Sequence, residues 1–197
     1  MEFMNIDDLL ARRVRELRKR RGLTLEQLAE HSGVSRSMIS LIERQETSPT
    51  AAVLNKLADA LGVTLPALFA PGSDGPTRQA LARAAEQPVW TDPASGYVRR
   101  HLSPGAYGSP IELVEVRFPP GQTVAFENPM RSVVTHQQVW MLEGTMQITA
   151  GEQVWHLHPG DCLALALGPQ ISFHNPTRQS ARYALALTTT PAQRSLA

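Results

Sequence analysis

The spacing of hydrophobic residues changes about a third of the way along the chain. Up to about Phe69 these residues recur every three or four positions, as at Leu10, Val14 and Leu17, which is the spacing of one helix face. Capping residues and glycines divide this stretch, with predicted helix starts at Thr24, Ser35, Thr50 and Pro66 and helix ends at Gly22, Gly33 and Gly62. The pattern predicts an all-α domain of five short helices over residues 1–70.

Short apolar runs between glycines and prolines replace this pattern from Val89 onward and predict β-strands. The predicted strands cover Ile111–Phe118, Val133–Leu142, Thr145–Thr149, Gln153–Leu157, Ile171–His174 and Arg182–Leu187. Turn residues recur about every 8–12 positions, which is typical of a β-sandwich or β-barrel. We therefore expect an all-β domain over residues 89–190 and a tail at 191–197. The Pro- and Gly-rich start of segment 71–88 predicts a linker, and residues 77–87 within it predict a short helix.

Composition limits the classes of protein that fit this layout. The chain has 197 residues and a formal net charge of +1, so two small domains fit and a polybasic or strongly acidic protein is excluded. Its one cysteine, Cys162, excludes an intrachain disulfide and a cysteine-based zinc site, and we expect this thiol to be buried and inert. The longest strongly apolar stretch, Cys162 to Leu167, is far shorter than the roughly 20 residues of a membrane helix. Residues 1–8 lack the apolar core of a signal peptide, so we expect a cytoplasmic protein with no membrane partner.

Residues 25–44 have the layout of a helix-turn-helix. Ala29 is small enough to let a second helix cross closely, and Gly33 permits a tight turn between the two helices. The far face of the second helix then carries Arg36, Ser37, Ser40, Leu41 and Arg44. These residues are small, polar or basic apart from the leucine, as a helix that enters the major groove of DNA requires.

Residues 9–69 resemble the helix-turn-helix of the phage repressor and Cro family, also called the XRE family. The matching residues are Leu17-Arg18, Gly22-Leu23-Thr24, Leu28-Ala29, Gly33-Val34-Ser35, Ile39-Ser40, Ile42-Glu43-Arg44, Pro49, Leu54 and Ala60-Leu61-Gly62-Val63. Two positions depart from the family pattern. Leu25 replaces a usual glutamine, which removes one phosphate contact, and Gln45 replaces a usual glycine, so the turn after the recognition helix can differ.

The resemblance implies that double-stranded operator DNA is the partner of this domain. The residues that it places at base edges are Arg36, Ser37, Met38 and Leu41. It implies phosphate contacts for Arg44 and for the start of the second helix at Thr24, and we add Ser35 and Ser40 to the expected DNA-contacting set. Met38 and Leu41 also lie beside the core stripe, so a core role for them stays open.

Basic residues concentrate on the first predicted helix. Seven of the 19 lysines and arginines lie between Arg12 and Arg21. Such a run is most often a solvated helix face, but beside a helix-turn-helix we expect some of these side chains to meet phosphates. The resemblance assigns Arg18 a structural role instead, in a partly buried ion pair with Glu43 that joins the first helix to the third.

The β-region contains fragments that resemble the cupin family over about residues 101–190. They are the strand–Leu-Glu-Gly–strand hairpin at 137–148, the turn Pro159-Gly160-Asp161 and the segment Phe173-His174-Asn175-Pro176. The resemblance implies a double-stranded β-helix, a jelly-roll-like barrel with a pocket in its mouth. Metal-bearing cupins carry histidines and a glutamate where this chain has residues 130–133, Gln137 and Ile171. Amide and aliphatic side chains are poor ligands for a divalent ion, so we expect no metal and no cofactor.

The histidines leave a displaced metal site open. His156 and His158 alternate along a strand and so share a face, but they lie on a different strand from the one that supplies the ligand pair of a cupin. His136 precedes Gln137 and so points to the opposite face of its strand, and His174 belongs to the closing strand. We expect surface or hydrogen-bonded histidines, with a site built from His136 and His174 as the alternative.

A pocket without a metal fits a small-molecule effector. Its expected lining is Val133, Gln137, Val139, Met141, Ile171 and Phe173, with Trp155 and Tyr183 as alternatives. Ligand sites are mostly apolar with a few placed polar groups, and Gln137 would be the polar group that orients the ligand. The alternative is that these side chains simply fill a small barrel.

Together these features predict a transcriptional regulator and not an enzyme. A single helix-turn-helix binds weakly, so we expect a homodimer that reads a two-fold symmetric operator. The cupin would sense a small-molecule effector, contribute the dimer contact, or both. Two alternatives stay open: a metal-dependent cupin enzyme tethered to DNA, and a cupin that serves only as a dimerisation or interaction module.

Overall fold

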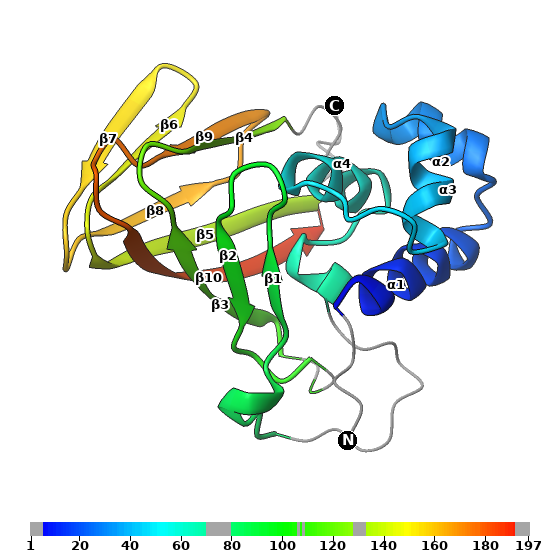
Figure 1. The fold of residues 1–197 in the computed structure, drawn as a ribbon, viewed down its shortest axis with the longest axis horizontal. Helices are drawn as coiled ribbons and strands as arrows, with labels where there is room; N and C mark the ends of the chain where they lie inside the picture. Colours follow the sequence, from blue (N-terminus) through cyan, green and yellow to red (C-terminus); the bar gives the residue numbers. More distant parts are fainter. Residues whose placement is uncertain (1–5, 70–79, 106, 108, 128–132, 192–197) are drawn as a thin grey trace.

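The helical part of the chain contains one helix fewer than the sequence predicts. The computed structural model describes residues 6–69, 80–105, 107, 109–127 and 133–191, and Figure 1 shows helices at one side and sheets at the other. The helical elements are α1 (Ile6–Arg20), α2 (Leu25–Ser32), α3 (Arg36–Glu43), α4 (Ala51–Ala60) and the 3-10 turn η1 (Pro66–Phe69). The prediction of five helices is therefore wrong. The fifth is a four-residue turn with three-residue hydrogen-bond spacing, from Ala67 N to Thr64 O (3.1 Å).

Capping fixes the boundaries of α2 and α3 where the sequence predicts them. Thr24 Oγ1 accepts a hydrogen bond from the N–H of Gln27 (3.1 Å), and the N–H of Thr24 donates to Gln27 Oε1 (2.9 Å). This reciprocal pair satisfies two donors that α2 itself cannot use. Ser35 Oγ accepts from the N–H of Met38 (3.2 Å) at the start of α3. Gly33 lies between the helices with φ +66°, which glycine adopts without strain.

A buried ion pair joins α1 to α3, as expected. Arg18 Nε and Nη2 donate to the two carboxylate oxygens of Glu43 at 2.6 Å each, and the side chains are 12% and 7% exposed. The hydrogen bonds that Arg18 donates to Glu43 raise the pKa of Arg18. Arg18 Nη1 also donates to the carbonyl of Leu23 (3.0 Å). The guanidinium therefore fixes α1, α3 and the turn before α2 in one arrangement.

Two antiparallel sheets form the β-domain. The strands are β1 (Val89–Thr91), β2 (Val98–His101), β3 (Ile111–Phe118), β4 (Thr123–Glu127), β5 (Val133–Glu143), β6 (Met146–Ala150), β7 (Gln153–Leu157), β8 (Cys162–Ala166), β9 (Gln170–His174) and β10 (Ala181–Pro191). One sheet has the order β1-β2-β3-β10-β5-β8 and the other β4-β9-β6-β7. Alternate side chains of both sheets point inward and form the core, as at Val116, Val139 and Ile148.

The six predicted strands correspond to β3, β5, β6, β7, β9 and β10, whereas β1, β2, β4 and β8 were not predicted. The helix predicted at 77–87 is wrong over the residues that are described. Residues 77–79 lie outside them, and only a 3-10 turn, η2 (Ala84–Glu86), follows. Its N-cap, Arg83, has no side-chain capping hydrogen bond, so nothing stabilises a longer helix before Pro88.

Motif residues of the β-domain have structural roles. Gly144 turns between β5 and β6 with φ +75°, and a Cβ there would lie 2.8 Å from Ala181 Cα and 2.9 Å from Ser180 O. Asn175 is fully buried, and its Nδ2 donates to the carbonyls of Phe118 (3.3 Å) and Gln179 (2.7 Å). The glycine of the hairpin and the asparagine that ends the second motif therefore maintain the fold.

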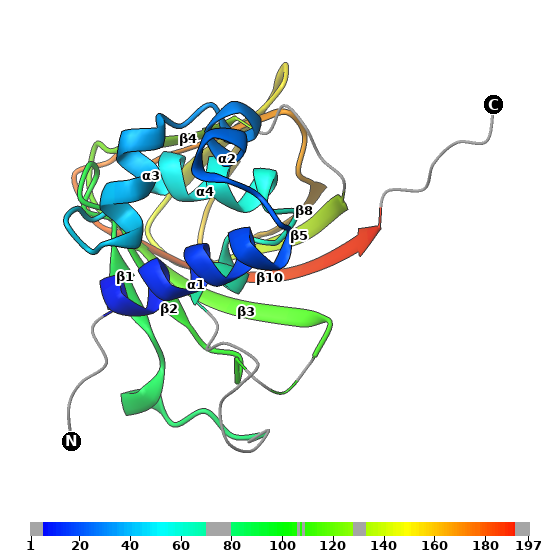
Figure 2. The same ribbon diagram turned by 90° about the vertical axis from the view of Figure 1, so that its right-hand side faces the viewer.

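The helical part packs directly on the β-domain. Figure 2 shows α4 lying against the sheets, and it contacts β4. The N–H of Ala51 donates to Asp92 Oδ1 (2.9 Å), and Thr64 Oγ1 donates to Glu112 Oε2 (2.8 Å). The ring of Phe69 stacks on His101 with centroids 4.2 Å apart. No helix in the described ranges is long and apolar enough to cross a membrane.

Candidate functional site

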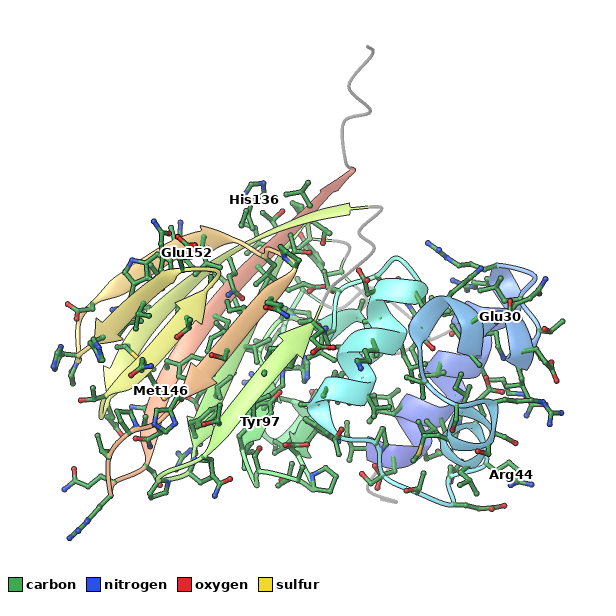
Figure 3. All side chains as sticks on the ribbon, turned by 90° about the horizontal axis from the view of Figure 1, so that it is seen from above. Glu30, Arg44, Tyr97, His136, Met146 and Glu152 are labelled. Atoms are coloured by element: carbon green, nitrogen blue, oxygen red, sulfur yellow. The ribbon has the colours of Figure 1, made fainter. Side chains whose placement is uncertain are left out.

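Helix α3 presents a polar and basic face on the side of the molecule away from the sheets. Arg36, Ser37 and Arg44 are exposed, while Ile39 and Ile42 are buried on the opposite face. Figure 3 shows Arg44 and Glu30 projecting away from the β-domain. Met38, Ser40 and Leu41 are half-buried at the border of the two faces. The set expected to contact DNA thus shares one accessible side of the helix-turn-helix.

Several members of this set already have intramolecular partners, and Arg44 pairs with Glu46. The hydroxyls of Thr24 and Ser35 accept the capping hydrogen bonds of α2 and α3, and Arg36 forms an ion pair with Glu26 at the start of α2. The hydrogen bond from its own backbone N–H is the largest effect that lowers the pKa of Glu26, and Arg36 adds to it. The Arg36–Glu26 pair is exposed, and such pairs contribute little to stability. Arg36 can therefore exchange Glu26 for a base or phosphate at small cost.

The turn after α3 keeps a left-handed residue although its usual glycine is missing. Gln45 has φ +63°, and it is the non-glycine residue with a positive φ within the described ranges. Its Nε2 donates to Asp8 Oδ1 (2.7 Å) on α1. The backbone at Gln45 therefore has the left-handed conformation that a glycine adopts readily, with a side chain that contacts α1.

The basic run on α1 divides into paired and exposed side chains. Arg13 donates to Glu16 (3.0 Å) and to the carbonyl of Ala67 (3.2 Å). Arg15 and Lys19 are exposed on the same helix. Only part of the run is therefore accessible to phosphates.

The metal positions of a cupin hold the wrong side chains. Gln137, in place of the glutamate, and Ile171, in place of the second-motif histidine, are both buried inside the barrel, and residues 130–132 lie outside the described ranges. An amide and an aliphatic side chain do not fit a divalent ion. Across the described ranges no three His, Cys, Asp or Glu side chains are grouped closely enough to hold a metal.

Four histidines and the cysteine of the β-domain are exposed or hydrogen-bonded to a neighbouring side chain. His136, His156 and His158 are exposed, and His174 Nδ1 shares a hydrogen bond with Thr123 Oγ1 (2.8 Å). The expectation of a buried Cys162 is wrong, because this residue is exposed. It starts β8 with its side chain on the outer face of an edge strand, and only the alternate residues Leu163 and Leu165 are half-buried.

A cavity of about 60 Å³ lies between the barrel and the helical part. Of the residues expected to line an effector pocket, Gln137, Ile171 and Phe173 border this cavity, and so does the alternative Tyr183. Val139 and Met141 do not line it. They are buried further along β5, with 0% and 1% exposure. The side chain of Val133 lies outside the described part of the chain.

The cavity has walls that the sequence does not indicate. From the helical part, Asn55, Ala58, Asp59, Val63, Thr64, Leu65 and Pro66 line it. From the β-domain, the additional polar lining residues are Tyr97, Arg99 and Thr135. The signal that could have found Tyr97 and Arg99 is their alternation in β2 and just before it, but this strand is short and rich in arginine.

Charged and polar groups around the cavity are strongly desolvated. Burial raises the pKa values of Tyr97 and Tyr183. Burial also raises the pKa of Glu112, against smaller opposing effects of the Thr64 hydrogen bond and the Arg99 charge. The pKa of His101 is well below its ordinary value, mainly because of burial and also because of Arg99. Burial favours the neutral forms of these groups, and Arg99 is a buried positive charge among them.

Comparisons with known proteins relate both parts of the chain to transcriptional regulators. The Helix-turn-helix family HTH_3 matches residues 14–68. Control protein C.SmaI of Serratia marcescens is 42% identical over 79 residues, which are 40% of this chain and 86% of that protein. The regulator PuuR of Escherichia coli is 26% identical over 189 residues, 91% of this chain and 94% of its own length. Another relative is matched along only 38% of its length.

A solved structure extends the likeness to the whole fold. The crystal structure of an HTH_3 family transcriptional regulator from Vibrio cholerae has a TM-score of 0.73 at 24% identity, covering 93% of this chain and 96% of that one. This match includes the β-domain with its two antiparallel sheets. The chain therefore belongs to the XRE family of helix-turn-helix transcriptional regulators.

Proposed function

We propose that this protein binds a two-fold symmetric DNA operator as a homodimer, through α3, and that its cupin-like domain senses a small-molecule effector. The observation that carries the proposal is the accessible face of α3, where Arg36, Ser37 and Arg44 lie together beside the start of α2. Small, polar and basic side chains at this position can contact base edges and phosphates in the major groove. The relatives named as transcriptional regulators support the same reading.

The position of the cavity supports a sensor. Its lining comes from both the barrel and the α4–η1 segment, so a bound molecule would contact the DNA-binding domain itself. A ligand shifts an equilibrium only if it binds one arrangement better than another. A ligand that bridges the two domains has this property, because a change in their relative position alters its contacts with one of them.

The outer face of the six-stranded sheet supports a dimer. Cross-strand rows on this face contain Leu113, Ala186, Gln138 and Ala164, and Trp140 lies one row away. Trp140, Ile111 and Leu113 are 53%, 53% and 44% exposed. Small residues between large apolar ones let a second sheet approach closely, so we place a second copy of this chain on the face.

The side chains at the metal positions argue against the alternative of a metal-dependent cupin enzyme. We therefore expect the purified protein to contain less than stoichiometric iron, zinc, nickel or manganese. The alternative of a cupin that serves only for dimerisation or protein interaction predicts no response to metabolites. A sensor predicts that at least one small molecule raises the melting temperature of the full chain by mass action.

Selection of DNA sites from random duplexes, at a stated salt concentration, tests the DNA-binding proposal. We expect a motif with two-fold symmetry and half-sites about one helical turn apart. Salt-sensitive binding without sequence preference would contradict the operator proposal. The selected motif, located in the source genome, would identify the genes that the protein controls.

A further inference from the structure

Three of the polar side chains that line the cavity have a hydrogen-bonding atom without a well-formed partner. Among the described residues, Arg99 Nε, Tyr97 OH and Gln137 Nε2 are buried side-chain atoms without a well-formed hydrogen bond, although the Tyr97 hydroxyl and the Arg99 guanidinium are close enough to influence each other. All three residues line the cavity, and they are 5%, 2% and 5% exposed. Buried polar groups in folded proteins are nearly always paired. Three unsatisfied donors around one cavity therefore indicate a missing acceptor.

The positive charge of Arg99 indicates that this acceptor is negatively charged. Its guanidinium cannot lose its proton, and burying an unpaired charge costs much free energy. Glu112 is the carboxylate whose pKa responds to Arg99, yet no ion pair of Arg99 exists among the described residues. Glu112 instead accepts the hydrogen bond of Thr64 at 2.8 Å. Asp59, the acidic residue of the lining, has an interaction of its own.

Most of the other lining residues are apolar. Phe118, Val124, Phe126, Ile171, Phe173 and Leu185 belong to the lining. Such walls favour a carbon chain over an inorganic ion, because an inorganic ion would lose its hydration against them. A space of about 60 Å³ exceeds the roughly 10–15 Å³ that one water needs, so a short organic molecule fits.

We propose that Arg99, Tyr97 and Gln137 bind the carboxylate of a small organic monoanion, whose carbon chain packs against the apolar walls beneath α4. A carboxylate matches the fork of a guanidinium, and one negative charge balances the one charge of Arg99. The inference rests on the proposed sensor role and specifies the class of its effector.

The test measures the binding of simple acids to the full chain. Thermal unfolding and calorimetry are performed with acetate, propionate, butyrate and benzoate, each against the amide of the same carbon skeleton. Propylamine, chloride and inorganic phosphate complete the panel. We expect at least one carboxylate to raise the melting temperature and the matched amide to leave it unchanged.

Variants assign the effect to the cavity. In Arg99→Gln we expect carboxylate affinity to fall roughly 10- to 100-fold, the range for a charged hydrogen bond. Tyr97→Phe removes one hydroxyl and keeps the ring that packs on Trp90 and Phe118, so we expect it to fold even if the arginine variant unfolds, and it should weaken binding of the same carboxylate. Arg100→Gln is the matched control, because Arg100 is the next residue on β2 and its Nη2 donates to the carbonyl of Ala84 (3.3 Å), outside the cavity lining. It should bind the carboxylate as the natural chain does.

The outcomes separate this inference from the sensor role. If amides or propylamine bind as well as carboxylates, the proposal of a monoanionic ligand is wrong, while the proposed sensor role remains. If chloride or phosphate binds as tightly as the carboxylates, the site binds simple inorganic anions, and the proposal of an organic ligand is wrong. If no compound binds while DNA selection still yields a symmetric motif, the carboxylate proposal fails and the DNA-binding proposal remains.

Discussion

At the scale of single residues, the pair Arg18–Glu43 is the contact whose loss should cost the most in the helical part. Both side chains are nearly buried and joined by two hydrogen bonds of 2.6 Å. We expect Glu43→Ala to leave the guanidinium of Arg18 buried without a carboxylate and to lower the free energy of unfolding by roughly 3–5 kcal/mol. Urea unfolding of the full chain, followed by circular dichroism, measures the change.

The control for this prediction is Glu46→Ala. Glu46 pairs with Arg44, and both side chains are at least half exposed, so the cost should be about 0–1 kcal/mol. Equal urea midpoints for the two variants would show that the buried pair adds nothing to stability.

His101 should make stability depend on pH. It is buried against Phe69, and burial holds its pKa well below the ordinary value. The unfolded chain therefore takes up a proton near pH 6.5 that the folded chain refuses, so the free energy of unfolding falls by about 1.4 kcal/mol for each pH unit below that value. Glu112, whose pKa is raised, acts in the opposite direction at lower pH, since the folded chain keeps its proton more readily than the unfolded chain.

The measurement is the pH dependence of unfolding between about pH 7.5 and 5.5, around the ordinary histidine value. His101→Phe keeps an aromatic ring on Phe69 and should flatten this dependence. His136→Phe changes an exposed histidine and should leave it as it is. A slope that is unchanged in the His101 variant would contradict the assignment.

Residue-scale features could be predicted where both partners are close in sequence. Thr24 and Gln27 form a capping box because three residues separate them, and Gly33 is recognisable as a turn residue by itself. The exposure of Cys162 and the burial of Arg99 and His101 were not predictable in this way. They depend on which face of a strand meets residues far away in sequence, and the local patterns of β2 and β8 do not specify that face.

At the scale of elements, α3 is the element on which the DNA-binding proposal depends. If Arg36 reads a base, we expect Arg36→Ala to weaken binding to the selected motif by about 1–3 kcal/mol and to relax preference at one position of each half-site. Gel-shift titrations on a panel of single-base variants measure both effects. A uniform loss over all sequences would make Arg36 a phosphate contact instead. Arg178→Ala, an exposed arginine of the β-domain, should change neither quantity.

The sequence predicts the α-helices because their evidence is local: the apolar spacing and the caps lie within each element. The strands with clear alternation, such as Gln153–Leu157, were predictable for the same reason. The strands β1 and β2 are short, and β2 reads Val-Arg-Arg-His, so their inward faces cannot be distinguished from the sequence. The last predicted helix is only a turn because the pattern at Pro66–Phe69 covers one turn and cannot specify hydrogen-bond spacing.

At the scale of the whole molecule, the contact between the two domains creates the cavity. The residues of its barrel wall that the sequence predicted are Gln137, Ile171 and Phe173. They could be selected because the resemblance to a cupin indicates which positions of the hairpin and of the closing strand face inward. The opposite wall comes from α4 and η1, more than 60 residues earlier in the sequence. No local sequence pattern indicates that these segments cover the open end of the barrel. The domain interface therefore had to be seen in the structure, and it places the cavity beside the helical domain.

The proposed dimer is tested on the outer sheet face. Trp140 is 53% exposed between small residues of β8 and β10, and a carboxylate there would lie desolvated and unpaired in a sheet-to-sheet contact. We expect Trp140→Glu to convert the dimer to a monomer in sedimentation velocity. Binding to a two-half-site operator should then weaken at least about tenfold, which corresponds to 1.4 kcal/mol, while binding to a single half-site stays the same. Val154→Glu places the same charge on a valine that is 49% exposed on the other sheet, and it should leave the dimer intact. If Trp140→Glu remains dimeric, the second copy binds elsewhere on the molecule.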